Sequence, residues 1–175
     1  MNKPNLKNEL VKRKFFRWLK EANGNCDSTV NNIENTILLY EEFTGNADFK
    51  TFSPDKATEF KKWLKKRVFR GKSISLVTYH SYLRSLRKFF RWLSWQPGYK
   101  SKISPDMVDY LSISEKEERI ATLCNPRNFP PLDYVVKLAD SIKINSEIDL
   151  RDRALIAFTL SSGMRDKAIA TLPLG

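Results

Sequence analysis

The chain has 175 residues, which is enough for one domain or for a small domain followed by part of another. Apolar residues make up 41% and aromatic residues 12% of it, which excludes extended disorder over most of the length. No segment reaches the roughly 20 apolar residues of a membrane span, and the N-terminus lacks the apolar core of a signal peptide. Cys26, Cys124 and the single His80 are too few for a zinc cluster or a disulfide framework. We therefore expect reduced cysteines, no bound metal, no cofactor, no small-molecule substrate and no membrane partner.

The net charge of +11 is distributed unevenly along the chain. Residues 1–102 contain 22 Lys and Arg against 9 Asp and Glu, an excess of +13, whereas residues 103–175 carry −2. An excess of this size over about a hundred residues is larger than solubility requires. It indicates a polyanionic partner, for which DNA and RNA are the usual candidates.

The first part of the chain is predicted to form four helices joined by short polar loops. The first covers residues 9–22. The second begins near Ser28, a predicted N-cap, and ends at Gly45. The third begins at Ser53, which precedes a proline and an acidic residue, and its pattern breaks at Gly71.

The fourth predicted helix, residues 75–95, has the strongest pattern. Its apolar residues lie on one face. On the opposite side the spacing i, i+3, i+4, i+7 places four cations in one stripe: Arg84, Arg87, Lys88 and Arg91. Small hydroxyl residues and Lys72 lie near the start of the helix, where the positive end of the helix dipole favours phosphate oxygens. A solvated basic surface is the simpler interpretation of this stripe, and contact with nucleic acid is the one that the charge excess favours.

The charge bias changes at a Gln-Pro-Gly turn, where the domain boundary is predicted. The expected organisation is a domain over 1–98, a linker over 99–104 and a second, incomplete domain over 105–175. The second domain is predicted to hold a short helix within 103–113, helices at 132–144 and 149–161, and a last short helix between 165 and 173. Its apolar helix faces are more than two elements can cover, which is why we expect it to be incomplete.

Two stretches of the sequence resemble a known family. Residues 149–165, DLRDRALIAFTLSSGMR, contain an Arg-Asp-x-Ala-Leu helix followed by a small-residue, Gly, apolar, Arg turn. This run is similar to the start of the catalytic domain of tyrosine recombinases, the phage-integrase-like family. Upstream, the basic four-helix part resembles the core-binding domain of the family, and residues 75–95 resemble its last helix. The resemblance covers essentially the whole chain.

The resemblance implies a mainly α fold: a four-helix SAM-like core-binding bundle, followed by the truncated, helical beginning of the catalytic domain. In the family a tyrosine attacks a DNA phosphodiester and forms a phosphotyrosyl intermediate, while arginines hold the phosphate oxygens. Arg165 matches the first of these catalytic arginines. Many members carry an acidic residue three positions later, where this chain has Ala168, so the support of Arg165 departs from the pattern.

The other catalytic groups of the family follow this point, and all six tyrosines of the chain precede Arg165. We therefore expect this chain alone to bind DNA without cleaving it. The resemblance implies a prokaryotic, cytoplasmic, DNA-associated protein, whose full-length form assembles as a tetramer on paired sites. The residues expected to contact double-stranded DNA lie on the second and fourth helices and just before the fourth: Lys72, Ser75, Thr78, Arg84, Lys88 and Arg91, with Thr29, Asn32 and Asn35 as weaker candidates.

Two alternatives stay open at this stage. One is a non-catalytic DNA-binding regulator that keeps the likeness without the reaction. The other is a helical scaffold that binds an acidic protein, which predicts no binding to duplex DNA at low salt.

Overall fold

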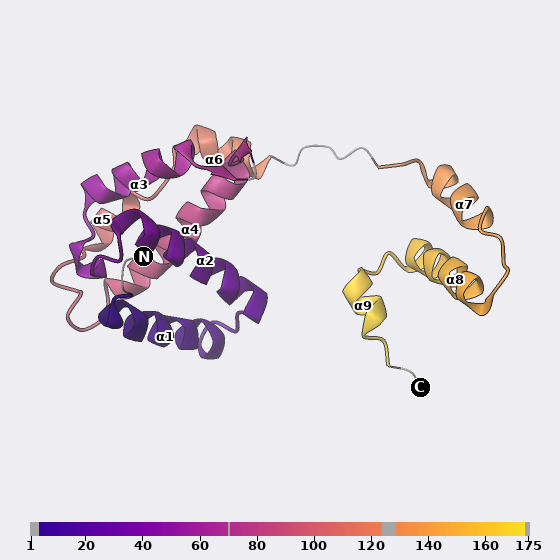
Figure 1. Ribbon diagram of the computed structural model, residues 1–175, viewed down its shortest axis with the longest axis horizontal. Coiled ribbons are helices and arrows are strands. Elements are labelled where there is room, and N and C mark those ends of the chain that lie inside the picture. The colour runs from indigo at the N-terminus through magenta and orange to yellow at the C-terminus, as the bar shows by residue number, and fades with distance from the viewer. Residues whose placement is uncertain (1–3, 70, 124–128, 174–175) are drawn as a thin grey trace. The chain divides into compact units, whose positions relative to one another are not determined.

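The computed structural model describes residues 4–69, 71–123 and 129–173. It is mainly helical, as predicted, with nine α-helices among the described residues. The chain forms two compact units, Met1–Cys124 and Asn125–Gly175, which are described separately below. Figure 1 shows α1 to α6 gathered in the first unit and α7 to α9 in the second.

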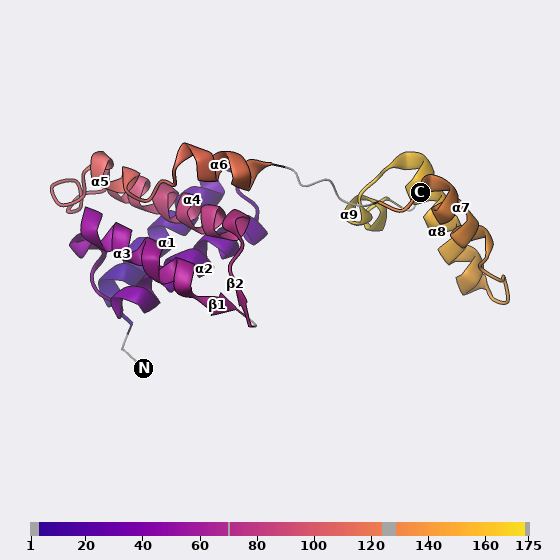
Figure 2. The same cartoon turned by 90° about the horizontal axis from the view of Figure 1, so that it is seen from above.

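The first unit consists of six α-helices, a 3-10 turn and a short hairpin. In chain order these are α1 (Leu6–Glu21), α2 (Asp27–Thr44), η1 (Phe49–Thr51), α3 (Pro54–Lys66), β1 (Val68–Phe69), β2 (Lys72–Ser73), α4 (Leu76–Leu93), α5 (Pro105–Asp109) and α6 (Glu115–Thr122). Helix α4 is central, because it contacts α2, α3, α5 and α6. Figures 1 and 2 both show α6 lying against α4.

The helix boundaries follow from local capping. The side chain of Ser53 accepts a hydrogen bond from the backbone N–H of Lys56 at the start of α3. Ser75 caps α4 in the same way, and Gly45 ends α2 in the left-handed conformation, with φ 65°. The predicted cap at Ser28 is wrong: α2 begins two residues earlier than that cap allows, with Cys26 at the N-cap position.

Aromatic rings form much of the core of the first unit. Phe90 of α4 stacks on Phe52, with 4.0 Å between ring centroids, and meets Tyr40 of α2 edge-on at 5.2 Å. Phe15 of α1 contacts Phe89 of α4 at 5.1 Å. Edge-on and offset ring pairs of this kind add to the free energy gained by burying the rings. The predicted apolar face of the fourth helix therefore packs against α1, α2 and the 3-10 region.

The first unit extends beyond the predicted boundary. Tyr99, Ile103, Val108 and Leu111 belong to its buried core, and the last three are 0% exposed. The segment is also held by polar contacts, since Lys61 Nζ of α3 donates to the backbone oxygens of Tyr110 and Ser112, at 3.0 and 2.7 Å. The predicted linker at 99–104 thus lies within the first unit, whose division from the second falls at residue 124.

A short β-hairpin with two residues in each strand follows α3, and it was not predicted from the sequence. Val68 pairs with Ser73 and Phe69 with Lys72 in an antiparallel register. Gly71 adopts φ 76° in the connecting turn, a conformation that a residue with a Cβ rarely takes. The hairpin places Lys72 on the short second strand.

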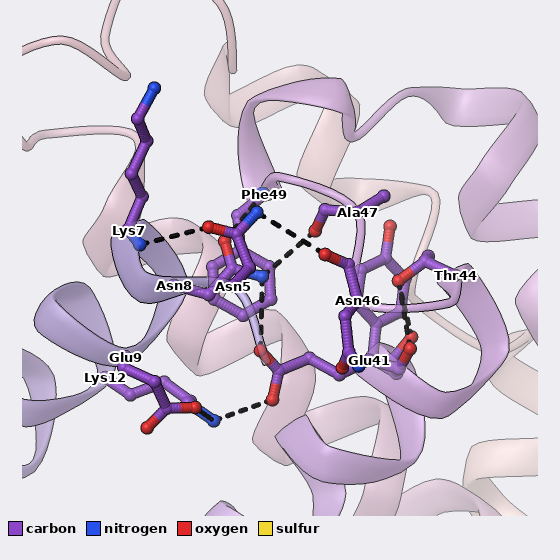
Figure 3. Close-up of polar contacts among 11 residues, drawn as sticks. Asn5, Lys7, Asn8, Glu9, Lys12, Glu41, Thr44, Asn46, Ala47 and Phe49 are labelled. Carbon is purple, nitrogen blue, oxygen red and sulfur yellow. Dashed lines mark hydrogen bonds and ion pairs between the residues drawn. The ribbon is translucent and has the colours of Figure 1, made fainter. Parts of the chain in front are cut away.

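Figure 3 shows a buried polar network that ties α1 to the C-terminal end of α2. Lys12 Nζ donates to Glu41 Oε2 at 2.7 Å, and Asn8 Nδ2 donates to Glu41 Oε1 at 3.1 Å and to the carbonyl oxygen of Ala47 at 3.0 Å. Asn8 Oδ1 in turn accepts from the backbone N–H of Phe49 at 3.2 Å. Asn8, Lys12 and Glu41 are at most 3% exposed, so each buried polar group is satisfied by another.

Burial and ion pairing act in opposite directions on Lys12. Burial alone lowers the pKa of its ammonium group, but hydrogen bonds to Glu41 and Glu9 outweigh that effect and raise the pKa above its usual value. Lys12 therefore remains charged at neutral pH. Its contribution to stability is present below the pKa of an unfolded lysine, and is lost as the pH rises through the raised value.

The second unit has little core of its own. It contains α7 (Leu132–Asp140), α8 (Glu147–Ser162) and α9 (Asp166–Ala170), and α7 packs against α8. Arg153 of α8 pairs with Asp140 of α7 at 2.8 Å. Among the described residues of this unit only Ala139 is buried, and no residue of α8 is.

We expect the backbone amides of α8 to exchange with solvent faster than those of α4. Helix α8 lacks buried side chains, whereas six residues of α4 are buried, and local opening is easiest where few apolar contacts resist it. Hydrogen–deuterium exchange of the whole chain, read by mass spectrometry, measures both helices in one sample. Equal protection of the two helices would contradict this account.

Candidate nucleic-acid interface

Helices α2 and α4 enclose a groove with a volume of about 540 Å³. Its walls carry cations, hydroxyl groups and one amide over a single apolar residue. The lining residues are Thr29, Asn32 and Ile33 from α2, and Ser81, Arg84, Ser85, Arg87, Lys88 and Arg91 from α4. We call this hollow the α2–α4 groove.

The α2–α4 groove is cationic, and none of the described residues that line it is acidic. Asp109 of α5 lies outside it and pairs with Arg87 at 2.7 Å and with Arg91 at 3.2 Å. Within the described part of the chain, no ion pair involves Arg84 or Lys88. Asp109 therefore partly neutralises Arg87 and Arg91, whereas Arg84 and Lys88 remain available to bind an anion.

Arg87 has an additional feature. Its Nε is buried and has no hydrogen-bond partner within the described part of the chain. Its Nη2 donates a hydrogen bond to Asp109 Oδ1 at 2.7 Å.

The structure brings five of the nine predicted DNA-contacting residues together. Thr29 and Asn32 of α2 face Arg84, Lys88 and Arg91 of α4 across the α2–α4 groove. The two groups are more than 50 residues apart in the sequence. They form one surface because α2 packs against α4.

The other four predicted residues lie elsewhere. Asn35 lines a separate small hollow that includes Glu42, and Lys72 lies exposed on the hairpin. The hydroxyl groups of Ser75 and Thr78 lie 2.9 Å apart, and Ser75 also caps the backbone N–H of Thr78. The hydroxyl residues at the start of α4 thus have a local capping role, and none of these four residues lines the α2–α4 groove.

Three polar groove residues were missing from the predicted contact set: Ser81, Ser85 and Arg87. A signal for them was present in the sequence. Arg87 belongs to the basic stripe of the fourth helix, and Ser81 and Ser85 precede Lys88 at helical spacing, two turns and one turn before it respectively.

Arg165 lies between α8 and α9. Gly163 ends α8 with φ 62°, and Arg165 occupies the N-cap position of α9 in an extended conformation. Its side chain is exposed, and no ion pair in the described part of the chain involves it. The described residues therefore show the glycine turn and the helix start, while the catalytic role of Arg165 stays a prediction.

Cys26 is an exposed thiol at the N-terminus of α2, beside Thr29 of the groove. Hydrogen bonds with the hydroxyl groups of Ser28, at 3.1 Å, and Thr29, at 3.2 Å, lower the pKa of the thiol to about 7. Cys124, the other cysteine, lies outside the described residues.

We expect the alkylation rate of Cys26 by iodoacetamide to rise through a midpoint near pH 7. An ordinary cysteine reaches its midpoint near about 8.5, and the thiolate is the reactive form. Ser28→Ala should move the midpoint upward, because the variant loses the larger of the stabilising hydrogen bonds. Both proteins should carry Cys124→Ser so that one thiol is read. A parent midpoint near about 8.5 would show that the hydroxyl groups do not stabilise the thiolate.

Other kinds of site are absent from the described residues. No cluster of His, Cys, Asp and Glu there has the arrangement of a metal site. None of the helices described combines the length and the apolar character needed to cross a membrane.

Comparison with protein-family models, with curated proteins and with solved structures finds no match for this chain.

Proposed function

We propose that the first unit binds double-stranded DNA through the α2–α4 groove. The observation that carries this proposal is the groove itself, where Arg84 and Lys88 are free of ion pairs among the described residues and lie beside hydroxyl and amide donors. Phosphate contacts in protein–DNA complexes come largely from such side chains. The charge excess in the first part of the chain adds long-range attraction for the same partner.

We propose further that the chain is the DNA-binding front part of a site-specific tyrosine recombinase. In this proposal the first unit is the SAM-like core-binding bundle and the second unit begins the catalytic domain. The support is the motif that ends at Arg165, together with the glycine turn and helix start that hold this residue. An exposed guanidinium at a helix start can stabilise the charge that develops on a phosphate during strand cleavage.

A non-catalytic DNA-binding regulator is the second candidate. All six tyrosines precede Arg165, and Tyr40, Tyr79 and Tyr99 are buried in the first unit. These 175 residues are therefore expected to bind duplex DNA and leave it uncut. Nicking of supercoiled DNA by this chain, with a protein–DNA covalent adduct, would contradict that expectation.

The expected binding is steeply dependent on salt. If two to four groove cations contact phosphates, the slope of log affinity against log salt lies between about −2 and about −4. Affinity then falls roughly 10- to 200-fold between about 50 and about 200 mM salt. Fluorescence anisotropy with a short labelled duplex measures this slope. An affinity that stays flat over that range would overturn the proposal. An absence of binding at low salt would overturn it too and would favour the acidic-protein scaffold.

A further inference from the structure

A second hollow adjoins the α2–α4 groove and has a different character. It has a volume of about 270 Å³, and three indole rings form most of its wall. The lining residues are Trp18 of α1, Lys88, Arg91 and Trp92 of α4, and Trp95 just beyond the end of α4. We call it the tryptophan hollow.

Two of the three indoles of the tryptophan hollow pack against a buried ring of the core. Trp18 and Trp92 lie with ring centroids 6.2 Å apart, and both contact the fully buried Phe15, at 5.8 and 5.1 Å. Trp95, in contrast, is 66% exposed. A large aromatic side chain held at this exposure beside other rings offers a flat apolar surface to a ligand.

Two cations belong to both hollows. Lys88 and Arg91 line the α2–α4 groove and the tryptophan hollow alike. Lys88 Nζ lies 5.9 Å from the centroid of the Trp18 ring, so its charge lies between the α2–α4 groove and the tryptophan hollow. A strand whose phosphate is held by Lys88 or Arg91 would bring the adjacent base to the indoles.

We propose that the tryptophan hollow binds an unpaired nucleobase of the DNA that lies in the α2–α4 groove. The inference rests on the proposed DNA binding and specifies the substrate class: a duplex with an unpaired nucleotide, as at an overhang, a fork or an interrupted strand. A base presents a flat π surface that stacks on an indole, and its phosphate supplies the negative charge that the bordering cations require. Stacking of this kind tolerates any base, because every base has such a surface.

A comparison of two DNAs tests the proposal on the whole chain. One probe is a blunt labelled duplex, and the other is the same duplex with a short single-stranded thymidine overhang. We expect the chain to bind the overhang probe at least about fivefold more tightly, and the ratio of the two affinities to approach one in Trp95→Ala. Trp95→Phe should keep much of the preference, whereas Trp95→Leu, which keeps apolar area without a ring, should not.

Tyr134→Ala is the matched control, because Tyr134 is an exposed aromatic residue of the second unit, at 58% exposure. It should leave the preference for the overhang intact. Tight binding of both probes with equal affinity would overturn this inference and leave the proposed DNA binding standing. No binding of either probe would overturn both. Concentration-dependent dimerisation that Trp95→Ala abolishes, without a preference for the overhang, would instead assign the tryptophan hollow to a second copy of the chain.

Discussion

Replacing Arg84 and Lys88 together with glutamate is expected to lower the affinity for duplex DNA by about 100-fold or more at low salt. These are the two cations of the α2–α4 groove for which no ion pair is present in the described part of the chain. The double variant removes two phosphate contacts and places two carboxylates against the backbone. The milder Arg84→Ala/Lys88→Ala pair should reduce the magnitude of the salt slope by about 2, since each lost contact accounts for about 0.9.

The control for this prediction is Lys62→Glu/Lys66→Glu on α3. It has the same i, i+4 spacing and the same change in net charge, and both lysines are exposed and outside the groove. If affinity depends on net charge alone, the two double variants will bind equally weakly. Equal losses would therefore contradict a localised interface, whereas the groove predicts a much smaller loss for the α3 pair.

Glu41→Ala is expected to destabilise the first unit by about 3 kcal/mol or more, because it removes one of the two acidic partners that Lys12 has among the described residues and leaves its buried ammonium group paired with Glu9. The variant also removes one of the two acceptors of Asn8 Nδ2. Urea denaturation followed by tryptophan fluorescence measures this loss in the whole chain. All four tryptophans lie in the first unit, so the signal reports its unfolding and not that of the second.

Glu42→Ala is the matched control one residue along α2. Glu42 also pairs with a cation, Arg67 at 2.8 Å, but its side chain is 56% exposed. An exposed pair contributes at most about 1 kcal/mol, so this variant should be nearly neutral. The double variant Lys12→Met/Glu41→Leu removes both charges and should recover most of the lost stability. Similar effects of Glu41→Ala and Glu42→Ala would show that burial of the Lys12–Glu41 pair is not what stabilises the contact.

The helices and the basic stripe could be predicted because their signals are local. Ser53 caps the helix that was predicted to begin there, and the spacing of Arg84, Lys88 and Arg91 fixes their common face once the helix forms. The composition of the groove wall on α4 is thus contained in one stretch of sequence.

Features that depend on tertiary packing could not be predicted in the same way. The turn at residues 96–98 has the signals of a domain end, yet the chain continues into the same core through Tyr99 and Ile103. Lys12 and Glu41 have the residue types of a surface, and only the approach of α1 to α2 buries them. Which polar residues of α2 face α4 depends on the rotation of α2 about its axis, which is why Asn32 lines the groove and Asn35 does not.

The tryptophan hollow is another feature that depends on tertiary packing and could not be predicted from the sequence. Trp18 lies on α1, whereas Trp92 and Trp95 lie at the end of α4, and no sequence pattern links them. Their meeting beside Lys88 follows from the packing of Phe15 against Phe89 and Trp92. Aromatic residues at helical spacing are most often core, so the exposed one among them is recognised only in the folded unit.

The most direct test of the account is a map of backbone amide chemical shifts on addition of duplex DNA to the isotope-labelled whole chain at low salt. If the α2–α4 groove is the interface, the largest shifts fall on Thr29 and Asn32 of α2 and on Arg84, Ser85 and Lys88 of α4, with small shifts on α3. Shifts confined to the hairpin, to α3 or to the second unit, with the groove residues unmoved, would contradict the central claim.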